Sequence, residues 1–64
     1  MNIIGKQVVV KLNSGIEYRG KMKCLDGYMN ISIEDTKEYY ENSQTNEFKT
    51  CFIRGNNVLF ISLE

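Results

Sequence analysis

The sequence predicts an all-β domain, formed by one small, strongly bent antiparallel sheet or open barrel of five strands. Apolar and polar residues alternate with a period of two in several segments. β-Branched and aromatic residues gather in short runs, and clusters of Gly, Asn, Asp and Ser separate these runs. No segment of useful length has a helical pattern. The 64 residues are enough for a single domain, 1–64.

The first two expected strands are 6–12 and 16–25. The first strand is a run rich in β-branched residues. It ends at Asn13-Ser14-Gly15, which has the composition of a turn. Alternation is clearest in the second strand, and its inward face comprises Ile16, Tyr18, Gly20, Met22 and Cys24. The outward face comprises Glu17, Arg19, Lys21 and Lys23. Gly20, in the middle of the strand, indicates a sharp bend or a close approach of two backbones.

The other three expected strands are 29–40, 47–53 and 58–63. Met29 and Ile31 are expected in the core. The polar stretch 41–46 predicts an exposed loop between the third and fourth strands. Arg54-Gly55-Asn56-Asn57 separates the last two strands.

The last two strands are apolar on both faces, which indicates a subunit interface. A 64-residue sheet has too little material to cover both faces, and an open apolar edge invites aggregation. We therefore expect neighbouring subunits to cover and extend it. An ordinary two-sided core strand is the alternative. The expected interface residues are Phe52, Ile53, Val58, Leu59, Phe60 and Ile61.

Composition limits the possible functions. Eight basic and eight acidic residues give zero net charge, which argues against binding nucleic acid through a broad basic face. Any such contact must be a local pocket. The two cysteines, Cys24 and Cys51, suggest a reducing compartment and two buried apolar thiols. No pattern predicts a membrane span, a secretory signal, a cofactor, a metal site or an enzyme.

Two short segments resemble the motifs of the Sm/LSm (Sm-like) family. Asp26-Gly27-Tyr28-Met29-Asn30, preceded by Tyr18-Arg19-Gly20, is similar to part of the first Sm motif, which would span about 5–40. Phe52-Ile53-Arg54-Gly55-Asn56-Asn57 is similar to the second motif, which would span about 47–63. Arg54-Gly55 indicates the archaeal and eukaryotic branch, because bacterial relatives lack it.

The resemblance implies an Sm fold, which is an SH3-like barrel usually preceded by a short helix. Only Ile3 and Ile4 could be the tail of that helix, and the basic C-terminal extension of the family is also missing. The termini are therefore either naturally short or trimmed, and we expect trimmed ones. The resemblance also implies a ring of six or seven LSm subunits, in which the fourth strand of one subunit pairs with the fifth of the next. Hetero-heptameric rings of this kind bind the U-rich 3′ ends of single-stranded RNA, and they act in splicing in the nucleus and in mRNA decapping and decay in the cytoplasm.

By the same resemblance, Tyr28, Asn30 and Arg54 would hold one RNA base. An aromatic ring and a guanidinium can stack on the two faces of a base. The amide of Asn30 has the donor and acceptor that the edge of uracil requires. The N–H of Gly55 could help to hold that edge, and Asn56 is a weaker candidate. We expect Asp26 to cap the turn and to hold Asn30 or Arg54 in place.

Two other functions stay open at this point. The chain could be a structural ring subunit whose base pocket is empty. It could also be an SH3- or Tudor-type barrel that binds a peptide or a methylated side chain, with Tyr39-Tyr40 as part of an aromatic cage. Taken singly, Tyr28 could be an ordinary turn aromatic and Arg54 a member of a surface ion pair.

Overall fold

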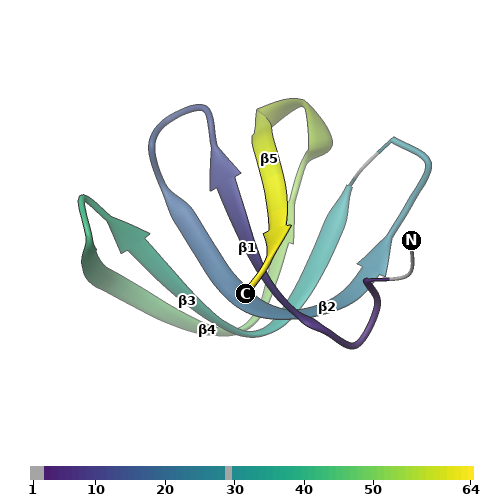
Figure 1. The fold of residues 1–64 in the computed structure, drawn as a ribbon, viewed down its shortest axis with the longest axis horizontal. Coiled ribbons are helices and arrows are strands. Elements are labelled where there is room, and N and C mark those ends of the chain that lie inside the picture. The colour runs from purple at the N-terminus through teal and green to yellow at the C-terminus, as the bar shows by residue number, and fades with distance from the viewer. Residues whose placement is uncertain (1–2, 29) are drawn as a thin grey trace.

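Five antiparallel strands form one open sheet in the computed structural model, which describes residues 3–28 and 30–64. The strand order is β4-β3-β2-β1-β5, and the long strands curve strongly along their length (Figure 1). The predicted all-β class and bent five-stranded sheet are confirmed. The elements are β1 (Gln7–Leu12), β2 (Glu17–Leu25), β3 (Ile31–Tyr40), β4 (Ser43–Ile53), a 3-10 turn η1 (Gly55–Asn57) and β5 (Val58–Leu63).

The first three strands start one or two residues later than expected. The first two strands begin one residue later than predicted, and the third begins at Ile31 rather than at residue 29. Met29 lies outside the described residues, so its expected place in the core is not tested. Ile3 has no regular secondary structure, and Ile4 lies in a turn. In the described part of the chain, no helix is long and apolar enough to span a membrane.

Gly20 lies where β2 and β3 approach each other most closely. A Cβ added to it would lie 2.6 Å from Cγ2 of Ile33 and 2.7 Å from the carbonyl oxygen of Glu34. Those distances are too short for any side chain, so only glycine fits. The pairing register shifts between Arg19 and Lys21, at this residue. The expected close approach at Gly20 is thus confirmed.

The core lies inside the curve of the sheet. Besides apolar residues, it contains the fully buried side chain of Thr36, whose hydroxyl donates a hydrogen bond of 3.1 Å to the carbonyl oxygen of Ile33. The sheet therefore buries this polar group with its hydrogen bond made. The buried apolar residues are Val8, Val10, Met22, Ile31, Ile33 and Ile53.

The predicted burial of both cysteines is wrong for Cys24, which is exposed, whereas Cys51 is half-buried. Met22 pairs with Ile33 and Cys24 pairs with Ser32, so Lys23 is an extra residue in β2. Such a β-bulge breaks the alternation of side chains along the strand. Burial, and then the nearby Glu38, raise the pKa of the Cys51 thiol.

The predicted loop at 41–46 is also wrong, because β4 begins at Ser43 and only a tight turn precedes it. Glu41 and Asn42 have φ angles of +51° and +67°, the backbone conformation that joins two strands by a two-residue hairpin turn. Beyond the turn, the Thr45 hydroxyl donates to the Glu38 carboxylate at 2.7 Å. Polar composition predicted a loop, but backbone pairing across the hairpin does not depend on apolar side chains.

The two outer strands, β4 and β5, expose apolar side chains. Phe52 is 80% exposed and Leu59 is 60% exposed, and Phe60 is also exposed. Ile53 is buried, and Val58 and Ile61 pack against the core. The same strands thus have apolar groups facing both the core and the solvent, and in this single chain the outer groups have no cover.

Candidate functional site

The turn between β2 and β3 is organised by Asp26. One carboxylate oxygen accepts hydrogen bonds from the backbone N–H groups of Tyr28 and Asn30, both at 2.9 Å. The other accepts a bond from the side-chain nitrogen of Asn30 at 3.2 Å. Hydrogen bonds from Asn30 and Tyr28 hold the pKa of Asp26 below its ordinary value. Asp26 therefore caps the turn and positions Asn30, whereas its described hydrogen bonds do not involve Arg54.

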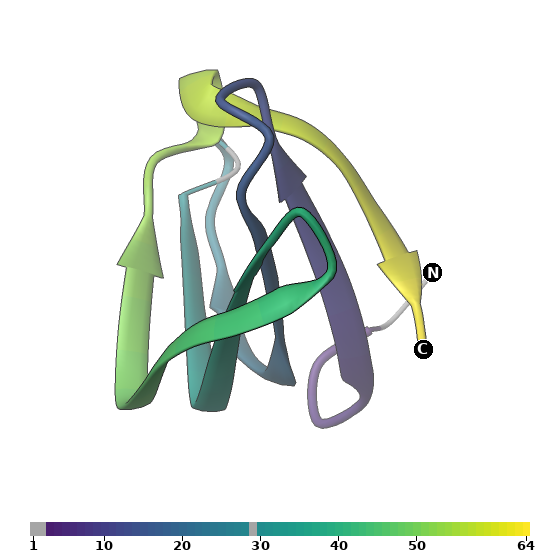
Figure 2. The ribbon, with the colours of Figure 1, turned by 90° about the vertical axis from the view of Figure 1, so that its left-hand side faces the viewer.

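The side chain of Asn30 joins this turn to the one between β4 and β5. Its Oδ1 accepts a hydrogen bond of 3.1 Å from the backbone N–H of Gly55, the first residue of η1. Figure 2 shows η1 beside the turn that joins β1 and β2, where the Asn13 N–H donates to the Asn57 carbonyl at 3.0 Å. The Gly55 N–H, expected to hold a base edge, is directed to Asn30 in this structure.

These two bonds also fix the orientation of the Asn30 amide. Its nitrogen must face the Asp26 carboxylate, which only accepts, and its oxygen must face the Gly55 N–H, which only donates. An amide has two N–H donors and two acceptor lone pairs. One donor and one acceptor are therefore still available on Asn30 for a ligand.

An open groove brings together four of the five residues expected to bind RNA. Tyr28, Asn30, Arg54 and Asn56 line it, although they come from two turns far apart in the sequence. Tyr28 is 86% exposed, so one large aromatic face is free for contact. Gly55 does not line the groove and acts on it through Asn30. The other lining residues are Lys23, Cys24, Ile31, Ser32, Phe52 and Ile53.

Lys23 and Cys24 are groove residues that the sequence did not indicate. They are neighbours in β2, and neighbours in a regular strand point to opposite faces of the sheet. The bulge at Lys23 allows both to line the groove. No turn residue or glycine marks this bulge in the sequence, so the alternating pattern gave no signal for it.

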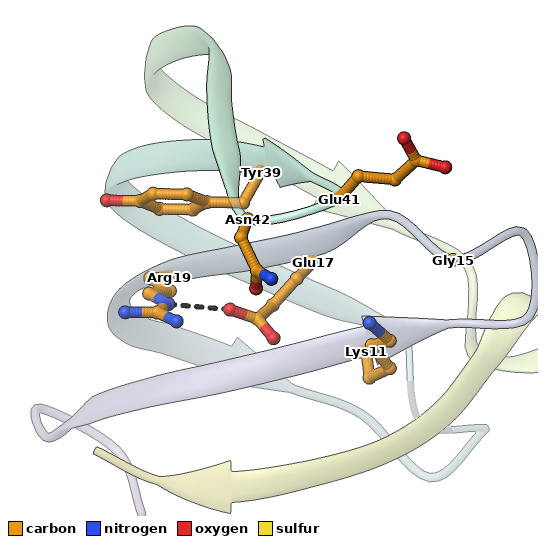
Figure 3. Close-up of a pocket in the computed structure, with 7 residues that line it drawn as sticks. All are labelled: Lys11, Gly15, Glu17, Arg19, Tyr39, Glu41 and Asn42. Atoms are coloured by element: carbon orange, nitrogen blue, oxygen red, sulfur yellow. Dashed lines mark hydrogen bonds and ion pairs between the residues drawn. The ribbon is translucent and has the colours of Figure 1, made fainter.

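A second pocket lies at the other end of β2 and β3 (Figure 3). The Nε of Arg19 donates to the Glu17 carboxylate at 2.6 Å, and the guanidinium lies over the Tyr39 ring with its carbon 4.6 Å from the ring centre. The remaining lining residues are Lys11, Gly15, Glu41 and Asn42. Because Arg19 of the same chain covers Tyr39, and Tyr40 does not line this pocket, the two tyrosines do not form an aromatic cage here.

The chemistry available in the groove is therefore stacking, hydrogen bonding by the oriented amide of Asn30 and by the side chains of Asn56 and Ser32, and contact with two cations. Within residues 3–28 and 30–64, no three His, Cys, Asp or Glu side chains come together in a way that could hold a metal ion. A groove with an exposed aromatic ring, an oriented amide and a guanidinium suits a flat, hydrogen-bonding ligand such as a nucleobase.

Comparison with known proteins agrees with this geometry. Residues 1–63 match the family model described as LSM domain. Sm-like protein LSM6A of Arabidopsis thaliana is 59% identical over 61 residues, which are 95% of this chain and 67% of the relative. A U6 snRNA-associated Sm-like protein LSm6 of Laccaria bicolor is 55% identical over 94% of this chain and 61% of its own length. The chain thus spans about two thirds of the length of these relatives.

Solved structures show the same fold. An Sm protein of Pyrococcus abyssii in complex with a uridine heptamer superposes with a TM-score of 0.94 and 31% identity, covering 97% of this chain and 87% of the other. A heptameric archaeal Sm protein superposes with a TM-score of 0.88 and 40% identity, covering 97% of this chain and 90% of the other. Within this family, the segments 25–30 and 52–59 resemble the sixth LSm protein, and the names of the two relatives agree with that. With its five-stranded sheet and a family match over 63 of its residues, the chain belongs to the LSM-domain (Sm-like) family.

Proposed function

We propose that this chain is an RNA-binding subunit of an Sm-like hetero-heptameric ring that binds the U-rich 3′ ends of single-stranded RNA. The observation that supports this best is the Asn30 side chain, fixed between Asp26 and Gly55 in a groove that it shares with Tyr28 and Arg54. A fixed amide in such a groove is suited to one flat base, and the proposal assigns that base to RNA.

The groove matches the chemistry of uracil. Tyr28 would stack on one face of the base, and the Arg54 guanidinium would cover the other. The donor and acceptor still available on Asn30 would pair with the uracil O4 and N3–H. Asn56 lines the same groove and adds a further polar contact. The position of the amide is set before RNA arrives, so little ordering is needed on binding.

The ring follows from the two edges of the sheet. β4 and β5 are the outer strands, and each has unpaired backbone groups and exposed apolar side chains. Pairing of β4 with β5 of a neighbour would satisfy these groups and cover Phe52, Leu59 and Phe60. One pocket binds a base weakly, with stacking of about 1–3 kcal/mol per base. A ring of pockets along one strand gains affinity through effective concentration.

The cellular role that we propose rests on relatives named as U6 snRNA-associated Sm-like proteins. The ring would bind the U-rich 3′ end of a spliceosomal small nuclear RNA in the nucleus and act in pre-mRNA splicing. A second ring would act in the cytoplasm, in decapping and decay of mRNA. The chain would serve as a binding subunit and not as an enzyme.

Binding of RNA is tested with the ring reconstituted from this chain and LSm partners. Tyr28→Ala, Asn30→Ala and Arg54→Ala should each weaken binding of oligo-U, while native mass spectrometry shows an unchanged ring. Tyr40→Ala is the matched control for Tyr28, because Tyr40 is an exposed tyrosine outside the groove. Variants that all bind as wild type would identify a structural ring subunit with an empty pocket.

Assembly is tested at the outer strand β5. Phe60→Glu places a charge among the exposed apolar groups of the edge and should prevent ring formation, measured by native mass spectrometry. Tyr40→Glu places the same charge on an exposed aromatic of β3, an inner strand, and should leave the ring intact. Rings that form normally with Phe60→Glu would contradict the proposed subunit contact.

A further inference from the structure

The charge of the RNA groove differs from that of the chain as a whole. The chain has eight acidic residues and eight basic ones. The groove is lined by two charged residues, Lys23 and Arg54, and both are cations. One residue in eight of the chain is acidic, but no carboxylate lines this groove. The groove therefore suits a polyanion, because its cations are not neutralised by acidic neighbours in the lining.

Lys23 owes its place in the groove to the β-bulge in β2. It is the extra residue between Met22, which pairs with Ile33, and Cys24, which pairs with Ser32. Bulges commonly redirect side chains beside functional sites. Here the bulge brings Lys23 to the same groove as the turns that hold Asn30 and Arg54.

The ammonium group of Lys23 is free to contact a ligand. The one ion pair among the described residues joins Arg19 to Glu17, at the other end of β2. Asp26, the acidic residue nearest to Lys23 along the chain, does not line the groove. Its two carboxylate oxygens accept hydrogen bonds from Tyr28 and Asn30.

We propose that Lys23 binds a phosphate of the RNA strand whose base lies between Tyr28 and Arg54. This inference rests on the proposed function and adds to it a residue for the RNA backbone. The Arg54 guanidinium is planar and suits the face of a base, whereas a lysine ammonium is a compact point charge that suits phosphate. Contacts with phosphate position a strand and add affinity, but they do not read the sequence.

The second pocket provides a matched comparison (Figure 3). Lys11 also has a free ammonium and lines a pocket on β1–β3, but Glu17 and Glu41 line that pocket too. Its two cations, Lys11 and Arg19, are balanced by two carboxylates. Lys11→Gln therefore removes the same charge as Lys23→Gln from a site that is not suited to a polyanion.

The test measures affinity of the reconstituted ring for oligo-U and oligo-C between 50 and 300 mM salt, with Lys23→Gln, Lys23→Arg and Lys11→Gln. For single strands, each phosphate contact contributes about 0.7 to the slope of log affinity against log salt. Lys23→Gln should reduce the slope by about 0.7 and the affinity by about fourfold near 150 mM salt. Both RNAs should lose affinity by the same factor. Lys23→Arg should keep the slope, and Lys11→Gln should change nothing.

Two results would overturn the role of Lys23: an unchanged slope with Lys23→Gln, or an equal loss with Lys11→Gln, which would mean a general charge effect. The proposed function is tested separately by Asn30→Ala. If that variant binds oligo-U as wild type does while Lys23→Gln lowers the slope, the phosphate contact stands and the base pocket fails. If Asn30→Ala weakens binding and Lys23→Gln leaves the slope unchanged, the base pocket stands alone.

Discussion

The side-chain oxygen of Asn30 accepts a hydrogen bond of 3.1 Å from the backbone N–H of Gly55, 25 residues further along the chain. This bond links the two turns whose side chains line the groove. Because the Asp26 carboxylate holds the amide nitrogen at 3.2 Å, Asn30 is fixed from both sides. The geometry of the site therefore depends on one amide more than on the stacking residues.

Asn30→Asp should weaken oligo-U binding by the assembled ring by about 1–2 kcal/mol, which is about 5- to 30-fold. The substituted carboxylate has the same shape but no donor, and it would face the carboxylate of Asp26. Affinity measured at constant salt checks this. Asn57→Asp adds the same charge in η1, outside the residues that line the groove, and should bind nearly as wild type does. Equal losses in the two variants would point to charge alone.

Asp26 should make the stability of the protein depend on pH under acidic conditions. Hydrogen bonds from Asn30 and Tyr28 lower the pKa of Asp26 in the folded state. Its contribution to the free energy of unfolding is therefore fully present when the pH is above the ordinary pKa of 3.8. It is lost as the pH falls through the lowered pKa. The difference in thermal unfolding temperature between wild type and Asp26→Ala should be constant near pH 6 and shrink below pH 3.8. A difference that does not change down to the lowest accessible pH would contradict this.

Gly20→Ala should lower the free energy of unfolding by about 1–3 kcal/mol, as overpacking of a filled core does. The added Cβ would lie 2.6 Å from Ile33 and 2.7 Å from the backbone oxygen of Glu34. Gly27→Ala is the matched control, because a Cβ there has no neighbour within 4 Å. Urea unfolding of both variants measures the difference, and equal stabilities would show that the sheet can open at Gly20 without cost.

Tyr18 should lose its proton later than an ordinary phenol. Its hydroxyl donates to the Glu38 carboxylate at 2.8 Å, and burial followed by this bond raises the pKa of Tyr18 from 10.0 to about 12. Above pH 10 the folded state therefore binds more protons than the unfolded state, and stability falls as the pH rises from 10 towards 12. Phenolate absorbance followed against pH should contain one late transition that Tyr18→Phe removes. If Tyr18→Phe removes absorbance from the transition near pH 10 and leaves the late one, the assignment is contradicted.

The sequence predicted the fold class and most of the expected RNA-binding residues of the groove, because these depend on patterns within short segments of the chain. Alternation of apolar residues reports which face of a strand is buried, and it identified Met22 and Ile31 as core residues. A glycine in the middle of a strand indicates a place where a side chain would not fit. Gly20 indeed lies where β2 and β3 approach each other closely, as expected.

The failures arose where backbone pairing decided the structure. One extra residue at Lys23 shifted the faces of β2, which exposed Cys24 and added two residues to the groove. A two-residue turn at Glu41 and Asn42 replaced the expected loop, because polar side chains do not prevent a hairpin. The bond of Gly55 to Asn30 depends on the distance between two turns, which sequence spacing does not give.

The strand order leaves β4 at one border of the sheet and β5 at the other, and these borders are unlike. A two-fold symmetric pair could join like border to like border, but it would leave the other border of each copy unpaired. Head-to-tail contacts leave one free border at each end of any chain of copies, however long. Only a closed cycle removes both, so a subunit that is defective at one border would stop closure and leave an open arc.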